Sequence, residues 1–145
     1  MLTRSSSESE SAARLRLAIT RVARRLRQEA NADLSPSLTS ALASIERHGP
    51  VTPSELATCE RVQRPTITRV LTRLTELGLV ERAADPADGR STLVSITPTG
   101  RALLSDLRTR RDAFLADRIS NLSPEDRAVL DHASAVLESL LEDDA

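Results

Sequence analysis

The chain has 145 residues, which is long enough for a single domain with one hydrophobic core. Its 20 basic and 21 acidic residues nearly cancel, so the net charge of −1 gives no direct sign of a nucleic-acid partner. The sequence has neither a run of about 18 apolar residues nor an apolar leader at its N-terminus, and we expect a cytoplasmic protein that does not enter a membrane.

The N-terminal third predicts a disordered tail followed by two helices. Residues 1–9 are rich in serine and glutamate, which favours disorder. Residues 10–32 carry apolar residues at helical spacing and should form one helix. A second helix should begin at Ser35 and end at Gly49, because serine caps helix starts and glycine is common at helix ends.

The next segment begins with the signature of a short helix. Thr52 is followed three residues later by Glu55, with proline between them at the first helical position, and this is a capping box. The helix should bury Leu56 and Ala57, and Val62 is a further candidate. A helix this short needs the following helix as a packing partner, which a helix-turn-helix provides.

The following helix should have an apolar face and a cationic face. Thr66, Arg69 and Arg73 share one side, and residues 61–75 contain four arginines and no acidic residue. An arginine can donate to guanine or to phosphate, but an arginine-bearing face can also be an ordinary solvated surface. The apolar face consists of Ile67, Val70, Leu71, Leu74 and Leu77.

A β-hairpin should follow. Gly78 is placed to end the helix in a left-handed conformation. Residues 79–82 and 91–96 are rich in β-forming side chains, and the intervening Pro, Asp and Gly favour a chain reversal. Arg90 falls at or beside the tip, where it could contact phosphate or a minor groove. Helix, turn, cationic helix and hairpin together are typical of a winged helix-turn-helix, which places one helix in a DNA groove.

Two further helices should complete the chain, with starts at Thr97 and Ser123. The helices at the two ends of the chain carry more apolar surface than a small three-helix head can cover. Burial against a second copy of the chain is the economical solution, and the alternative is packing within one chain. The downstream apolar residues include Leu103, Leu104, Leu107, Phe114, Leu115, Ile119, Val129, Leu130, Ala133, Val136, Leu137, Leu140 and Leu141.

The segment ITRVLTRLTELGLVERAADPADGRSTLVSITPTGRALL resembles the core of the MarR family of transcriptional regulators. In length and helix order the resemblance spans about residues 10–142. It implies a mainly α-helical fold with a small β-hairpin wing, in one domain of residues 10–145. A winged helix-turn-helix head would occupy residues 33–97, and residues 10–32 and 98–142 would be dimerisation helices. The matching features are the spacing of Thr68, Arg69 and Arg73, the GLVER of residues 78–82, the D-P-x-D-x-R of residues 85–90, and the V-x-I-T-x-x-G of residues 94–100.

The resemblance also implies a function. Members of the family are homodimeric DNA-binding proteins, mostly repressors, often released from DNA by a small aromatic ligand or by cysteine oxidation. We therefore expect a sequence-specific regulator that binds a pseudo-palindromic operator in double-stranded DNA as a homodimer. A small-molecule effector is an open expectation, because Phe114 is the one aromatic residue and a stacking pocket would be poor. An aliphatic pocket with an arginine for an acid group is conceivable.

By resemblance, Thr68, Arg69 and Arg73 would face the major groove and Arg90 would enter the minor groove. A wing salt bridge from Asp85 or Asp88 to an arginine is implied as well. The wing departs from the family pattern in having glycine instead of a second basic residue before Arg90, which halves the positive charge at its tip. The complete set of expected DNA-binding residues is Arg64, Pro65, Thr66, Thr68, Arg69, Arg73 and Arg90.

Other functional classes find less support. The two histidines lie far apart, no metal-ligand, phosphate-loop or nucleophile motif is present, and we expect neither an enzyme nor a cofactor. Cys59 is the single cysteine, so no intramolecular disulfide can form. It suits a buried structural position, and a redox-sensing role is the alternative. A winged helix that binds an acidic protein surface instead of DNA also remains open.

Overall fold

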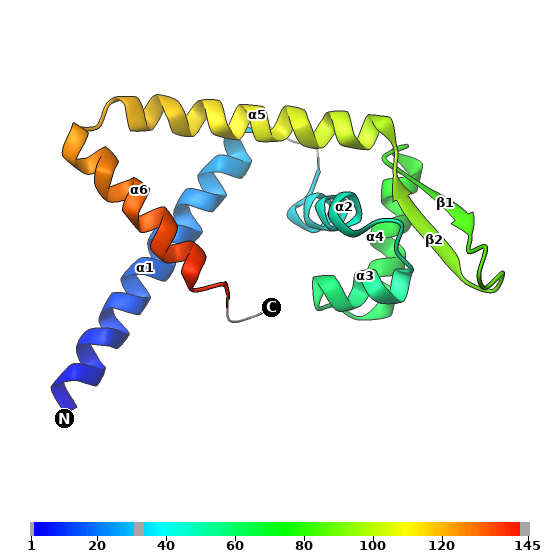
Figure 1. Cartoon of the computed structure of the whole chain (residues 1–145), viewed down its shortest axis with the longest axis horizontal. Helices are drawn as coiled ribbons and strands as arrows, with labels where there is room; N and C mark the ends of the chain where they lie inside the picture. The colour runs from blue at the N-terminus through cyan, green and yellow to red at the C-terminus, as the bar shows by residue number, and fades with distance from the viewer. Residues whose placement is uncertain (1, 31–33, 143–145) are drawn as a thin grey trace.

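The computed structural model describes residues 2–30 and 34–142. In these ranges the chain is mainly α-helical with one antiparallel hairpin, as predicted. Helix α5 runs along the length of the molecule, with the hairpin and three helices at one end and the two terminal helices toward the other (Figure 1). The elements are α1 (Leu2–Glu29), α2 (Pro36–His48), α3 (Pro53–Glu60), α4 (Arg64–Glu76), β1 (Val80–Ala84), β2 (Thr92–Ile96), α5 (Pro98–Ser120) and α6 (Pro124–Ser139).

Four helices begin at the serine or threonine caps that the sequence predicts. Ser35, Thr52, Thr97 and Ser123 each accept a hydrogen bond from the backbone N–H three residues later, and a proline follows each of them. The capping box of α3 is complete, because the backbone N–H of Thr52 also donates to the Glu55 carboxylate at 2.9 Å. These helix starts are therefore encoded by local sequence.

The head consists of α2, α3, α4 and the hairpin, which enclose a single core. Of the predicted apolar face of α4, Ile67, Leu71 and Leu74 are buried and Val70 is half-buried. The prediction is wrong for Leu77, which is 39% exposed. It is the C-cap residue after Glu76, and so lies beyond the turns that pack on the core.

The hairpin follows α4 directly. Gly78 adopts a φ of 71°, as predicted for a left-handed helix stop, and the N–H of Leu79 donates to the carbonyl of Leu74 at 3.0 Å. In the antiparallel register Val80 lies opposite Ile96. Val51, between α2 and α3, forms a bridge with β2 and so ties the start of the helix-turn-helix to the hairpin.

The start of α5 packs tightly against the hairpin. A side chain at Gly100 would place its Cβ 2.3 Å from the carbonyl oxygen of Leu79 and 2.7 Å from Cγ1 of Ile96. Leu104, one turn further along α5, is buried in the same core. The absence of a side chain at Gly100 thus lets α5 support the wing.

The N-terminal segment differs from its prediction. Residues 2–9 are not disordered but form the first turns of α1, while residue 1 lies outside the described residues. No glycine or proline occurs before Glu29, and serine and glutamate are tolerated in helices. Once the apolar part of α1 is helical, extending the helix backwards costs little, because nucleation has already occurred.

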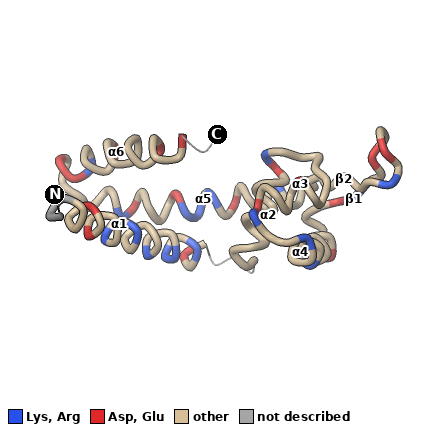
Figure 2. Tube along the Cα trace, turned by 90° about the horizontal axis from the view of Figure 1, so that it is seen from below, with Lys and Arg blue, Asp and Glu red and all other residues tan. Residues whose placement is uncertain are grey.

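Helices α1 and α6 flank α5 on opposite sides (Figure 2). Helix α1 contacts α5, where Phe114 lies between two guanidinium groups, 5.5 Å from that of Arg25 and 5.1 Å from that of Arg118. Helix α6 contains no buried residue. Within the described residues, no helix has the length and apolar character needed to cross a membrane.

Candidate nucleic-acid interface

The outward face of α4 brings together most of the predicted DNA-binding residues. Thr68, Arg69 and Arg73 are exposed, Pro65 is exposed in the first turn, and Thr66 is half-buried. The opposite side of the same helix is fixed in the core, so this face has a defined orientation. Blue segments of the tube in Figure 2 mark the basic residues on α4 and at the wing tip.

Two exposed threonines of α4, Thr68 and Thr72, use their hydroxyl protons within the helix. Thr68 Oγ1 donates to the carbonyl of Arg64 at 3.0 Å, and Thr72 Oγ1 donates to the carbonyl of Thr68 at 2.8 Å. Each side chain then retains a methyl group and oxygen lone pairs for a partner. These groups suit contact with a thymine methyl or with a base amino group.

The two arginines of this face differ in their partners. Arg73 lies 3.4 Å from a carboxylate oxygen of Glu76, and both side chains are more than half exposed. A pair this exposed contributes at most about 1 kcal/mol and can exchange for another partner. Among the described residues Arg69 forms no ion pair. Arg69 is therefore the guanidinium that is free to bind an incoming ligand.

The wing tip is ordered by backbone hydrogen bonds. Asp85 Oδ1 accepts from the N–H of Ala87 at 2.9 Å, and Asp88 Oδ1 accepts from the N–H of Arg90 at 3.1 Å. The expected wing salt bridge is wrong for this structure, because neither aspartate lies in an ion pair with a described residue. Each carboxylate instead closes an Asx turn within the loop.

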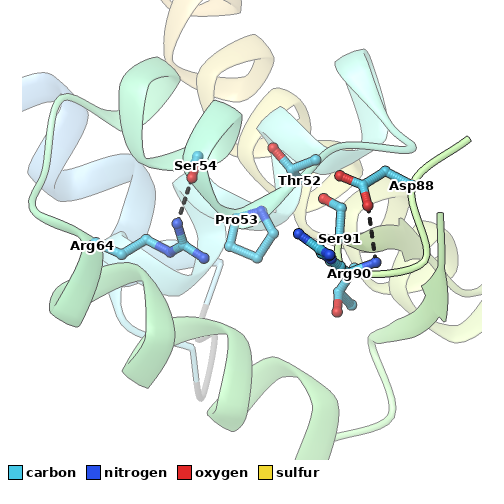
Figure 3. Close-up of a pocket in the computed structure, with 8 residues that line it drawn as sticks. Thr52, Pro53, Ser54, Arg64, Asp88, Arg90 and Ser91 are labelled. Carbon is cyan, nitrogen blue, oxygen red and sulfur yellow. Dashed lines mark hydrogen bonds between the residues drawn. The ribbon is translucent and has the colours of Figure 1, made fainter.

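A polar cleft of about 320 Å³ separates the start of α4 from the wing (Figure 3). Arg64, at the first position of α4, points back toward α3 and donates a hydrogen bond to the Ser54 hydroxyl. No sequence motif assigns a binding role to Ser54. Its place in the first turn of a helix, beside backbone N–H groups without helical partners, is the one sequence feature that indicates a binding site there. The cleft is lined by Thr52, Pro53, Ser54, Arg64, Asp88, Arg90, Ser91 and Thr92.

The turn of the helix-turn-helix differs from expectation at two apolar positions. Arg61 ends α3 in a left-handed conformation with a φ of 55°, and Val62 beyond it is 39% exposed rather than buried. Cys59 is also exposed, against the prediction of a buried structural cysteine. Helix α3 buries Leu56 and Ala57, and at about 100° per residue Cys59 lies on the flank of the face that they form. The redox role of Cys59 stays a prediction.

Known proteins are similar to this chain in both sequence and fold. A model of the MarR family matches residues 34–92, from α2 to the start of β2. An uncharacterized HTH-type transcriptional regulator of Mycobacterium bovis is 36% identical over 138 residues, 94% of this chain and 96% of the relative. The chain belongs to the MarR family. It is accordingly a winged helix-turn-helix transcriptional regulator.

Solved structures agree with the MarR fold. The crystal structure of a transcriptional regulator protein from Pseudomonas aeruginosa superposes with a TM-score of 0.85 at 37% identity, covering 94% of this chain and 96% of that one. A mutant of MepR from S. aureus bound to an oligodeoxyribonucleotide has a TM-score of 0.70 at 19% identity, covering 91% and 98% of the two chains. The similarity to the MepR mutant shows only that the two chains share a fold. The DNA in that structure is bound to MepR.

Proposed function

We propose that this MarR-family regulator is a homodimeric repressor that binds a pseudo-palindromic operator in the cytoplasm. In each protomer α4 enters the major groove, with Thr66, Thr68, Arg69 and Arg73 toward the base edges, and the wing that carries Arg90 lies at the adjacent minor groove. The observation that carries the proposal is the exposed arginine and threonine face of α4, which is held in one orientation by its buried opposite face.

Charge distribution supports a nucleic-acid partner despite the net charge of −1. Residues 61–75 carry four arginines and no acidic residue, and this segment lies on the head. DNA affinity from such a surface depends strongly on salt, since bound phosphates release counterions. A winged helix that binds an acidic protein through the same arginines would show no preferred DNA sequence.

The unpaired faces of the terminal helices support a dimer. In α1, Leu15, Ile19 and Val22 are 44%, 46% and 51% exposed and repeat at intervals of three and four residues, which places them on one face. In α6, Val129 and Leu140 are 63% and 62% exposed on one face as well. Exposed apolar side chains this large and this numerous on the two terminal helices are typical of a buried interface. A two-fold dimer would present two α4 helices to half-sites about one DNA turn apart.

A small-molecule effector has a candidate site between the head and the terminal helices. A cavity of about 470 Å³ there is lined by aliphatic side chains and two hydroxyl residues, Thr39 and Ser40, and by two arginines, Arg27 and Arg111. An aliphatic carboxylic acid would pair with the guanidinium groups of these arginines. Binding there would change the angle between the head and the dimer helices.

The test is DNA binding by the purified protein, measured by fluorescence anisotropy on DNA from upstream of its own gene and on scrambled DNA at two salt concentrations. Tighter binding to the upstream DNA that weakens steeply with salt is expected. Salt-independent or absent binding to every duplex, including duplexes selected from a random pool, contradicts the proposal and favours the protein-binding alternative. Release of bound DNA by aliphatic carboxylates, lost in Arg111→Met, is the expected result for the effector.

A further inference from the structure

Two positive side chains from different elements face one cleft. Arg64 belongs to the first turn of α4, Arg90 belongs to the wing tip, and the start of α3 forms the wall between them (Figure 3). The cleft volume of about 320 Å³ is ample for a phosphate group. Its lining is almost wholly polar.

The direction of Arg64 separates its role from that of Arg69. Its guanidinium is turned toward α3 by the hydrogen bond to the Ser54 hydroxyl, instead of lying along the outward face of α4. An arginine held in this way is not placed to reach base edges in the groove that α4 would occupy. The remaining N–H groups of the guanidinium stay available to the cleft, because Ser54 accepts at one of them.

The geometry of DNA decides what would occupy the cleft. A major groove and the neighbouring minor groove are separated by a single sugar–phosphate strand. With α4 in one groove and the wing tip in the next, that strand must cross the space between them, and the cleft fills this space. Phosphates recur about every 3.4 Å along the axis of one strand, so one of them always falls near the crossing point.

We propose that the cleft binds one phosphate of the strand between the two grooves, with Arg64 and Arg90 as its ligands and Ser54 as a positioning residue that orients Arg64. This inference rests on the proposed function. It deepens that function by assigning Arg64 to the backbone of the DNA rather than to its sequence.

Asp88 limits the affinity of this site. Its carboxylate lines the same cleft and accepts a hydrogen bond from the backbone N–H of Arg90. One negative charge therefore stands beside the phosphate and offsets part of the charge of the two arginines. Asparagine would keep the oxygen that accepts from Arg90 and would remove the charge, so Asp88→Asn separates the two effects.

The experiment uses the full chain and a duplex selected by the wild-type protein from random DNA. Single phosphates in the strand between the grooves are replaced, one at a time, by uncharged methylphosphonate, and affinity is measured for wild type, Arg64→Ala and Arg14→Ala. Arg14 belongs to α1, a helix that lies toward the other end of the molecule from the wing, and serves as the matched control.

We expect one methylphosphonate position per half-site to weaken the wild-type complex about tenfold, as estimated for one charge-assisted hydrogen-bonded contact. Arg64→Ala should bind all sequences about tenfold more weakly and should lower the slope of log K against log salt by about 0.9 per protomer. It should also lose part of its sensitivity at that one position, because Arg90 remains as the second ligand. Arg14→Ala should behave as wild type.

Two further variants test the positioning residue and the charge. Ser54→Ala should show part of the loss of DNA affinity seen in Arg64→Ala, without a change in thermal unfolding. Ser54→Thr should bind like the wild type, because the hydroxyl is kept. Asp88→Asn should bind several-fold more tightly, and Asp112→Asn on α5 is the charge-matched control.

The outcomes separate the two proposals. Specific binding by the wild type with no sensitive phosphate, or with full affinity in Arg64→Ala, overturns the phosphate site and leaves the proposed function standing. Asp88→Asn binding no more tightly than wild type also contradicts the site as described. Failure of the wild-type protein to select any duplex overturns the proposed function, and the phosphate site with it.

Discussion

The Ser44 hydroxyl donates a 2.5 Å hydrogen bond to Oε1 of Glu60 and so joins α2 to the last turn of α3. Ser40, one turn earlier on α2, donates to the other carboxylate oxygen at 2.7 Å. The carboxylate thus fixes the end of α3 directly before the turn that leads to α4. A contact at this place fixes the position of α3 relative to α2.

We predict that Glu60→Ala lowers the free energy of unfolding by about 2 kcal/mol, because hydrogen bonds to a charged group each contribute about 1.5–3 kcal/mol when partly shielded from water. Glu60→Gln should have a smaller effect, since the amide keeps one acceptor and can donate to the second serine. Urea denaturation measures both. Glu81→Ala on β1 is the control, because Glu81 is exposed and forms no ion pair with a described residue. Equal stability of Glu60→Ala and Glu81→Ala would contradict the prediction.

A second prediction distinguishes the arginines of α4. Arg69→Ala should cost about 1–3 kcal/mol on the preferred operator and much less on other sequences, as expected for loss of a base contact. Glu76→Gln should increase affinity, because it releases Arg73 from its partner at 3.4 Å and removes a negative charge from the DNA-facing helix. Competition binding with single-base operator variants measures both effects. A uniform loss across all sequences would assign Arg69 to a phosphate.

The glycines provide a third, graded prediction. Gly89→Ala should leave stability unchanged, since nothing lies within 4 Å of the added Cβ. Gly78→Ala should lower the free energy of unfolding by about 1–2 kcal/mol, because a φ of 71° disfavours a residue with a Cβ even in open space. Gly100→Ala should cost more than Gly78→Ala, since its Cβ would lie 2.3 Å from a backbone oxygen that only a movement of α5 or the hairpin can relieve. Thermal unfolding of the three variants tests the order.

Much of the head could be predicted from sequence because its determinants are local. The cap at Thr52, the left-handed glycine at Gly78 and the apolar period of α4 each act within a few residues, and the structure contains all three. The contacts that orient the site are not local. Ser44 and Glu60 are separated by 16 positions, and Ser54 and Arg64 by 10, so no periodicity reveals them.

The incorrect expectations arise where the surroundings of a residue, and not its own type, decide its structure. Cys59 and Val62 are apolar or weakly polar residues near buried ones, but a helix as short as α3 buries a single face, and the turn at Arg61 leads the chain outward. Asp88 was assigned an arginine partner by resemblance, while the nearest backbone N–H satisfies it first. Sequence composition at residues 2–9 indicated disorder, although the adjoining helix extends through them.

The dimer gives the last prediction, which uses two adjacent residues on α6. Val136 is 46% exposed and shares a face with Val129 and Leu140, whereas Ala135 lies on the other side of the helix. Val136→Asp should place a charge in the interface and yield monomers, because an unpaired charge buried between protomers is strongly unfavourable. Since α6 has no buried residue in the single chain, the head should stay folded.

Ala135→Asp adds the same charge next to that position and should remain dimeric. Sedimentation velocity measures the mass, and circular dichroism checks that both variants keep their helices. The Val136→Asp monomer should also bind a complete operator with an affinity close to that for one half-site, because two heads no longer bind as one unit. A dimer of unchanged stability in Val136→Asp would show that this face of α6 points to solvent, and the apolar face of α1 would then be left to form the interface.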